Sequence, residues 1–327
     1  AWAGEGTFTY STSTLIFSKS GTAIYTFRHG EDVYNLTQGS GNTLSLKCVD
    51  DGGGTLDFYG TLDMSGTKLT THADSSNTNI RFREGSKTLI IDNPSTALAD
   101  LYRVTMHHSS GTNTVPACTV KRFIQSGAGT TTLSGALTVT ENAAGAFSQS
   151  AGTFNTSGSN HAVTVTGEFD HTGGTFTSNS STVTVRNLVI TNTSSTTFNA
   201  PDSSGMLNIT GEGSSGSGDG YAFRRVSGAF VDNSGTVTFK TPTTTAIRMG
   251  TAAQNFHNVI IDESSAGGLF YVNDEGFTVT GSLTLTDGDF DTTLGTATPL
   301  IDIQGDLTIG ANNTFGGITQ TQTSDIS

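Results

Sequence analysis

The sequence predicts an all-β protein whose chain winds into a parallel β-helix, or β-solenoid, of imperfect turns of about 22 residues. Short stretches of Val, Ile, Leu and Phe alternate with Thr or Ser, which is the period-two pattern of strands with one buried face. Gly, Ser and Asn interrupt these stretches at short intervals, as turns require, and 41 of the 327 residues are Gly. Phrases of the sequence also recur, which is typical of stacked structural repeats.

One phrase recurs without a gap in residues 163–177 and 277–291. A Gly stands between two short strands in both copies, where it permits a bend that a Cβ would obstruct. The apolar positions are Val163, Val165, Phe169 and Phe176 in the first copy and Phe277, Val279, Leu283 and Phe290 in the second. We expect all eight side chains to point into one continuous core, because one turn cannot bury its own apolar face alone.

The turn length follows from a second repeat, a strand led by Thr or Ser that begins at residues 13, 78, 181 and 245. Two of the spacings agree, 78 − 13 = 65 and 245 − 181 = 64. Each accommodates about three turns of roughly 22 residues. The remaining spacing, 181 − 78 = 103, implies one or two turns inserted between residues 110 and 160.

Two domains are predicted. Residues 1–125 form an N-terminal β-rich domain that is more irregular and carries more charge, and residues 126–327 form the β-solenoid repeat domain. A β-sandwich of antiparallel strands is an alternative for the N-terminal part, because short strands at regular intervals fit that fold as well. Both cysteines, Cys48 and Cys118, lie in this part. They are too few for a disulfide framework, and whether they pair is left open.

The Gly-, Thr- and Ser-rich phrase TVTGEFDHTGGTFT of residues 164–177 resembles the β-solenoid repeats of bacteriophage fibre and decoration proteins and of bacterial surface adhesins. The resemblance implies a structural or adhesive, extracellular protein on a virion or cell surface. A phage fibre, spike or capsid decoration protein is the first expectation, and a bacterial or archaeal adhesin or filament subunit is the alternative. Such a protein associates with itself or with other structural surface proteins, and a glycan or receptor is a further possible partner.

Composition excludes two classes of partner. The formal net charge is −13, and an acidic surface repels the phosphates of nucleic acids. No apolar stretch approaches the roughly 18 residues that a membrane span needs. We therefore expect neither nucleic-acid binding nor membrane insertion.

Candidate chemistry is sparse, and we expect the protein not to be an enzyme and to need no cofactor. Asp287, Asp289 and Asp291 alternate along one stretch, so in a continuous strand they would share a face and offer oxygens to Ca²⁺. Residues 211–216 fit G-x-G-x-x-G, but a dinucleotide site needs a helix to follow, and Ser, Gly and Asp follow instead, which predicts a flexible loop.

A polysaccharide-degrading β-helix enzyme is the third functional alternative. Two carboxylates flanking a sugar bond carry out glycoside hydrolysis, so a groove with carboxylates stacked on adjacent turns would favour it. Trp2 is the only tryptophan and is a candidate anchor for contacts between copies of the chain, because aromatic residues are enriched at interfaces.

Overall fold

The computed structural model describes residues 14–17, 21–38, 43–49, 54–64, 68–71, 77–87, 89–91, 102–191, 195–211, 220–241, 244–250, 253–263, 268–292, 299–311, 313 and 315–316. Every regular element within these ranges is a β-strand, and they contain no helix. The all-β prediction is confirmed.

The chain divides into two compact units, and each is a β-solenoid. Unit 1 comprises residues 1–141 and 146–161, and unit 2 comprises residues 142–145 and 162–327. One turn contributes three strands, most of which pair in parallel with a strand of the next turn, so each unit has three rows of strands, named A, B and C in chain order. The sequence-predicted domain boundary at residue 125 stays a prediction, because compactness alone does not define an independently folding domain.

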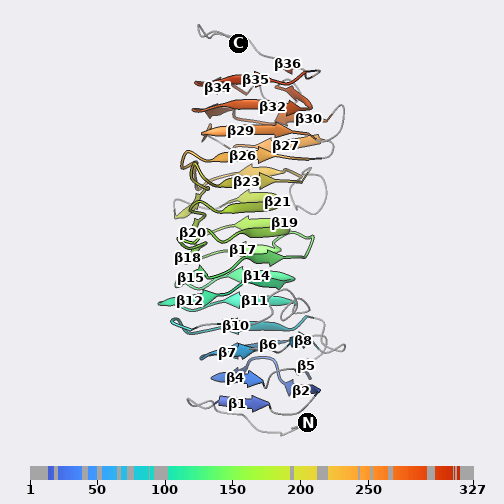
Figure 1. Ribbon diagram of the computed structural model, residues 1–327, viewed down its shortest axis with the longest axis vertical. Coiled ribbons are helices and arrows are strands. Elements are labelled where there is room, and N and C mark those ends of the chain that lie inside the picture. The colour runs from blue at the N-terminus through green and yellow to red at the C-terminus, as the bar shows by residue number, and fades with distance from the viewer. Residues whose placement is uncertain are drawn as a thin grey trace. The chain divides into compact units, whose positions relative to one another are not determined.

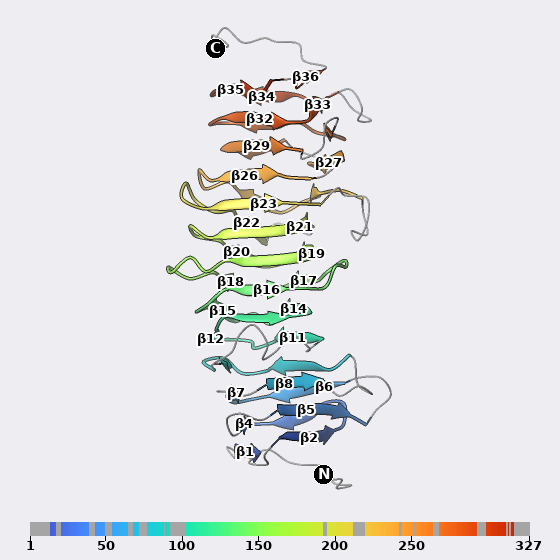
Figure 2. The same cartoon turned by 45° about the vertical axis from the view of Figure 1, so that its right-hand side comes forward.

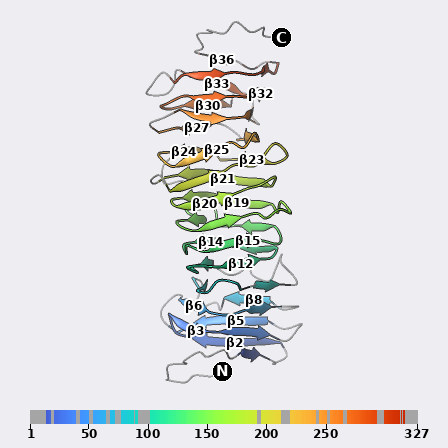
Figure 3. The same cartoon turned by 90° about the vertical axis from the view of Figure 1, so that its left-hand side faces the viewer.

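Unit 1 is coloured blue to green in Figure 1. Its strands β2, β5 and β8 lie side by side, as Figure 3 shows. Row A holds β1 (Thr14–Phe17), β4 (Asn35–Gln38), β7 (Leu62–Met64), β10 (Leu89–Ile91), β12 (Thr112–Val115), β15 (Thr130–Leu133) and β18 (Thr153–Asn155). Row B holds β2 (Thr22–Phe27), β5 (Thr43–Cys48), β8 (Lys68–Thr71), β13 (Cys118–Val120) and β16 (Leu137–Val139). Row C holds β3 (Glu31–Val33), β6 (Thr55–Phe58), β9 (Asn79–Phe82), β11 (Arg103–Met106), β14 (Arg122–Gln125) and β17 (Phe147–Gln149).

In unit 2 the long strands β19 (Val163–His171) and β21 (Thr182–Ile190) run through both row B and row C. Row B continues with β23 (Met206–Ile209), β26 (Thr236–Phe239), β29 (Asn258–Asp262), β32 (Leu283–Asp287) and β35 (Leu307–Ile309), stacked in this order in Figure 2. Row C continues with β24 (Phe223–Arg225), β27 (Thr244–Arg248), β30 (Leu269–Val272), β33 (Asp289–Asp291) and β36 (Phe315–Gly316). Row A holds β20 (Gly174–Thr177), β22 (Thr196–Asn199), β25 (Ala229–Val231), β28 (Gln254–Phe256), β31 (Phe277–Val279) and β34 (Ile301–Ile303).

The described strands of the N-terminal part pair in parallel, as in β1 with β4, β2 with β5 and β3 with β6. A β-sandwich would require antiparallel pairs, so the solenoid alternative is the one that this part of the chain adopts. One turn takes 21 residues in row A, where Asn35 lies beside Thr14. It takes 24 residues in row C, where Asn79 lies beside Thr55. These lengths agree with the predicted turn of about 22 residues.

The two copies of the repeated phrase lie on different faces of the solenoid. Phe169 lies in row C and Phe176 in row A, whereas their counterparts Leu283 and Phe290 lie in rows B and C, so the gapless match is displaced by one face. The Thr-led strands likewise begin in different rows, which accounts for their unequal spacing. Sequence similarity alone does not distinguish the faces, because all three need the same alternation.

The predicted insertion between residues 110 and 160 is also misplaced. This part of the chain forms ordinary turns, such as the 19 residues that separate His107 from its hydrogen-bond partner Ser126 on the next turn. A long turn occurs instead in unit 2, where Leu188 pairs with Phe223. There the Asn187 side chain reaches the backbone of Tyr221, which lies 34 residues later in the chain.

The core of unit 2 is a column of stacked phenylalanines, and all eight side chains predicted to point inward are at most 1% exposed. Consecutive rings lie 4.8 to 6.3 Å apart between centroids, in the order Phe176, Phe198, Phe230, Phe256, Phe277, Phe290 and Phe315. Aromatic pairs at such distances add to the free energy of burial. The column therefore joins every turn of unit 2 from β20 onward into one core.

The corner between rows C and A of unit 1 is polar but satisfied. The amide of Gln125 donates to the carbonyl oxygens of Gly127 and Gly129 at 3.0 and 3.2 Å and accepts a 2.6 Å hydrogen bond from Thr131 Oγ1. A Cβ at Gly129 would lie 2.2 Å from the ring of His108, so the close stacking of this corner requires glycine. Buried amides thus supply the hydrogen bonds that the turning backbone lacks.

His171 occupies the same kind of corner in unit 2, buried beside Phe169 and Phe198. Its Nε2 lies 3.1 Å from the carbonyl oxygen of Thr197, so it donates there as a neutral imidazole. Burial lowers the pKa of His171 to about 4, because a charged ring is poorly solvated among phenylalanines.

The two cysteines do not form a disulfide. Cys48 and Cys118 are both buried, and burial raises the pKa of the Cys118 thiol to about 12. Both therefore act as small core residues.

We expect Phe176→Ala to lower the free energy of unfolding by about 3–5 kcal/mol, because it removes one ring from a packed column. Chemical denaturation monitored by circular dichroism measures this change. Thr177→Ala, on the same strand and half-buried, is the matched control. A near-neutral effect of Phe176→Ala would mean that the column does not hold the turns together.

We expect the free energy of unfolding to decrease on acidification, in part because of His171. The folded pKa lies below the unfolded value of about 6.5, so the stabilising contribution is complete above pH 6.5 or so and is lost as the pH falls towards about 4. The loss amounts to about 3 kcal/mol. His171→Gln keeps a donor for Thr197 and should remove this part of the pH dependence, measured by denaturation between pH 4 and 7.

Burial raises the pKa of neighbouring Asp170, which acts in the opposite direction, so the difference between the His171→Gln variant and the wild type is the relevant quantity. An unchanged pH dependence in the variant would contradict the neutral, buried histidine.

Candidate functional site

Row C of unit 1 carries many polar side chains on its outer face. We call the outward side chains of β3, β6, β9, β11 and β14 the outer ladder. Val33, Phe58 and Phe82 point into the core and are nearly fully buried, so alternation directs their neighbours outward. The register places Asp32 beside Asp57, Asp57 beside Arg81, and Arg81 beside Thr105. One polar position therefore repeats on four successive turns.

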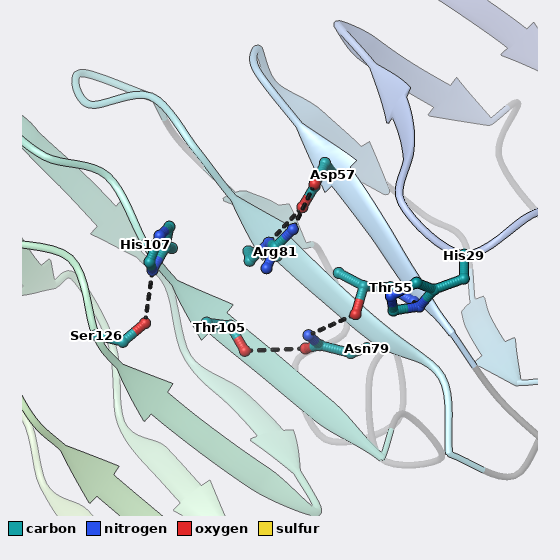
Figure 4. Close-up of polar contacts among 8 residues, drawn as sticks. All are labelled: His29, Thr55, Asp57, Asn79, Arg81, Thr105, His107 and Ser126. Atoms are coloured by element: carbon teal, nitrogen blue, oxygen red, sulfur yellow. Dashed lines mark hydrogen bonds and ion pairs between the residues drawn. The ribbon is translucent and has the colours of Figure 1, made fainter. Parts of the chain in front are cut away.

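The centre of the outer ladder is an ion pair between Asp57 and Arg81. Arg81 Nε donates to Asp57 Oδ1 at 2.5 Å and Nη2 donates to Oδ2 at 2.6 Å, as Figure 4 shows. The side chain of Asp57 is 6% exposed and that of Arg81 is 30% exposed. The hydrogen bond to Asp57 raises the pKa of Arg81. This bidentate geometry fixes both groups.

A second line of side chains runs beside the ion pair. Asn79 Nδ2 donates to Thr55 Oγ1 at 3.3 Å, and Thr105 Oγ1 donates to Asn79 Oδ1 at 3.0 Å (Figure 4). His29 Nδ1 accepts a 3.1 Å hydrogen bond from the backbone N–H of Thr55. Thr55, Asn79 and Thr105 are each less than a tenth exposed. Together they form a hydrogen-bonded support for the charged groups.

Titratable groups at the edge of the ladder are displaced from their ordinary pKa values. Burial and then the neighbouring Asp57 raise the pKa of Asp32. Burial and then the charges of Arg83 and Arg81 lower the pKa of His107, whose Nδ1 lies 2.9 Å from Ser126 Oγ. The side chains of Asp32 and Arg83 make no hydrogen bond or ion pair to any residue in the described ranges. The ladder therefore offers an acceptor and a donor to a ligand.

Two arginines meet at Tyr102, at the start of β11 and β14. The guanidinium carbons of Arg103 and Arg122 lie 5.5 and 5.3 Å from the centroid of the Tyr102 ring. Arg103 and Arg122 are direct partners in the register. Arg122 donates to the two carboxylate oxygens of Glu141 at 2.8 and 3.2 Å. The Tyr102 ring stabilises each nearby guanidinium electrostatically. Arg103 and Arg122 nevertheless repel each other, because they carry like charges at directly opposite positions.

The sequence-predicted calcium residues are not brought onto one face. Asp287 ends β32 and Asp289 begins β33, with Gly288 at a φ of 94° between them. Only Asp289 and Asp291 share a strand, because the chain turns a corner where the prediction assumed a continuous strand. Among the described residues no group of three or more His, Cys, Asp or Glu side chains is placed to hold a metal ion. Trp2 and residues 212–219 of the Gly-rich loop lie outside the described residues.

The outer ladder was not predicted from the sequence, although the sequence contains a signal for it. Asp32, Asp57, Arg81 and Thr105 follow one another at intervals of 57 − 32 = 25, 81 − 57 = 24 and 105 − 81 = 24 along the sequence. This spacing matches the turn length measured in row C. A search for polar residues repeating at the turn length would have found the ladder.

Comparison with known proteins gives no family, because no family model, curated protein or solved structure matches the chain. The described part of the chain contains no helix long and apolar enough to cross a membrane.

We expect the pKa of His107 to respond to its charged neighbours in opposite directions. Arg83→Gln removes a repelling cation and should raise the pKa of His107, whereas Asp57→Asn removes an attracting carboxylate and should lower it further. Titration of the histidine ring signals by NMR measures both changes. Ser126→Ala, which removes only the hydrogen-bond partner, is the control for a local change without a change of charge. Equal, unshifted titration in both charge variants would contradict the arrangement of the ladder.

Proposed function

We propose that this chain is a structural and adhesive surface protein, first of all a fibre, spike or capsid decoration protein of a phage virion. The observation that carries the proposal is the column of stacked phenylalanines in unit 2, in which each turn buries its rings against the turns before and after it. Such a core supports length and stiffness rather than a single central site. The apolar residues of the repeated sequence phrases form part of this core.

The outer surface supports the same proposal. Along the strands, buried apolar residues alternate with half-exposed or exposed Thr, such as Thr164 beside Val163 and Val165 in β19. The net charge of −13 favours solubility and discourages unspecific contacts with nucleic acids. A polar, acidic exterior over a largely apolar core suits a protein that stands in solution at the outside of a particle. A bacterial or archaeal cell-surface adhesin or filament subunit has the same requirements and is the alternative context.

A polysaccharide-degrading enzyme is the second candidate, and one observation favours it. Asp32 and Asp57 are carboxylates stacked in register on adjacent turns, at a strand separation of about 4.8 Å. Pairs of carboxyl groups with different environments carry out glycoside hydrolysis. However, both oxygens of Asp57 accept hydrogen bonds from Arg81. That occupied carboxylate is poorly placed to attack or to activate water, so the structural role is preferred.

Immunogold labelling of material from the native source, with antibodies raised against this chain, tests the proposal. We expect label on the surface of virus particles. Label on cell envelopes or cell-attached filaments would overturn the virion assignment in favour of the adhesin alternative. Label confined to soluble material would overturn the surface role.

The enzyme alternative has its own assay. The purified chain is incubated with a panel of neutral and acidic polysaccharides, and newly formed reducing ends are measured. We expect no release above background. Release that disappears in Asp32→Asn, but persists in Asp63→Asn on β7 of row A, would overturn the structural proposal.

A further inference from the structure

Three arginines among the described residues lie over tyrosine rings, and two of them have a carboxylate of their own. Arg122 lies over Tyr102 and is paired with Glu141. Arg248 lies 5.7 Å from the centroid of the Tyr221 ring, and its Nε donates to Asp274 at 2.9 Å. The third, Arg103, has the same aromatic neighbour as Arg122 but no carboxylate within the described part of the chain.

Arg103 has no compensating anion among the described residues. Its Nε is buried and has no hydrogen-bond partner among the described residues. Its nearest partner in the register on one side is the like-charged Arg122. On the other side stands Asn79, whose amide group already bonds to Thr55 and Thr105. A buried donor without an acceptor and a neighbouring like charge both destabilise the protein.

Arg83 is a second arginine on the same face, and its charge partly offsets the rise that burial causes in the pKa of Asp32. Arg83 follows β9 directly, and its backbone N–H donates to Phe58 at 2.8 Å, so the ladder continues through it. Its guanidinium has no ion-pair partner in the described residues. Because Arg103 pairs with Asn79, four residues before Arg83, the backbone positions of the two arginines are offset by about 13 Å along the strands.

The charge on this face differs in sign from that of the whole chain. The outer ladder and Arg83 carry the basic residues Arg81, Arg83, Arg103 and Arg122, against the acidic residues Asp32 and Asp57 and against Glu141, which pairs with Arg122. The whole chain has 15 basic and 28 acidic residues. A locally positive face on an acidic protein attracts an anion to this place rather than to the surface in general.

We propose that Arg103 and Arg83 bind two carboxylates, on non-adjacent sugar residues, of an acidic polysaccharide that lies along the outer ladder of unit 1. The two Nη groups of a guanidinium can donate two parallel hydrogen bonds to a planar carboxylate, so the buried Nε of Arg103 is not required. Two arginines whose backbone positions are offset by about 13 Å along one face fit two carboxylates of one polymer better than one small anion. This inference deepens the proposed adhesive function by naming the ligand class, and it rests on that function.

A nucleic acid is the competing polyanion, and the geometry disfavours it. Single strands bind by stacking bases on open aromatic rings beside a cationic groove. Here Arg103 and Arg122 lie over the Tyr102 ring, and Lys87 Nζ lies 5.2 Å from the centroid of the Tyr34 ring. Because these cations already lie over the Tyr102 and Tyr34 rings, the rings are not open for stacking with nucleic-acid bases.

Isothermal titration calorimetry of the whole chain tests the proposal, with polygalacturonate as the acidic polysaccharide. Dextran of similar length is the neutral control, monomeric galacturonate tests the need for a polymer, and single-stranded DNA is the competing polyanion. We expect binding to polygalacturonate that weakens with added salt, no binding to dextran, and weaker binding to the monomer. Binding to dextran or DNA as tight as to polygalacturonate, or a monomer as good as the polymer, would overturn the proposal.

Variants assign the binding to the two arginines. Arg103→Gln and Arg83→Gln should each weaken polygalacturonate binding by about tenfold, and Arg103→Lys should give an intermediate loss because it keeps the charge without the fork. The matched control is Arg248→Gln, which removes an arginine with the same kind of aromatic neighbour but with its own carboxylate, and should leave affinity within about twofold. Circular dichroism verifies that each variant is folded. Unchanged affinity in folded Arg103→Gln and Arg83→Gln would overturn the proposal, and the surface location measured by labelling would stand or fall separately.

Discussion

The stacking of like side chains on successive turns is the interaction on which the rest of this structure depends. A single turn of three short strands has no interior of its own, so it becomes stable only when its apolar side chains meet those of the turns on either side. Each inner ring of the phenylalanine column in unit 2 is therefore held from two directions. The same requirement fixes the register of all three rows, because a slip of one residue would turn buried side chains outward.

Stacking also explains the polar parts of the molecule. Where the chain turns a corner, the backbone loses ladder partners, and buried side chains such as Gln125 and His171 replace them from the inside. On the outside, the same register brings Asp57 and Arg81 into a bidentate pair and sets Arg103 against Arg122. Favourable and unfavourable neighbours thus arise from one rule: a residue faces whatever stands one turn earlier and one turn later.

The fold could be predicted from the sequence because stacking of like side chains on successive turns requires a periodic pattern of residues. Alternation of Val and Thr identified strands, and all eight predicted core positions, from Val163 to Phe290, are buried. It could not assign the faces, because rows A, B and C share one pattern and differ only in what they contact. The candidate site was harder still. Asp57 and Arg81 are 24 residues apart and look like unrelated surface charges until the local turn length is known. The aspartates from Asp287 to Asp291 were grouped wrongly because a corner at Gly288 is not visible in the alternation.

The long turn from Leu188 to Phe223 has a consequence for how such a chain can change. The turns before and after it keep their register, although this one takes 223 − 188 = 35 residues, against 188 − 169 = 19 and 247 − 223 = 24 for its neighbours. Extra residues between two strands therefore leave the stacked rungs undisturbed, and selection can lengthen, replace or remove such segments one at a time. The same tolerance makes the sequence between β23 and β24 a natural place to graft a foreign peptide for display, since the stacked strands do not have to be redesigned.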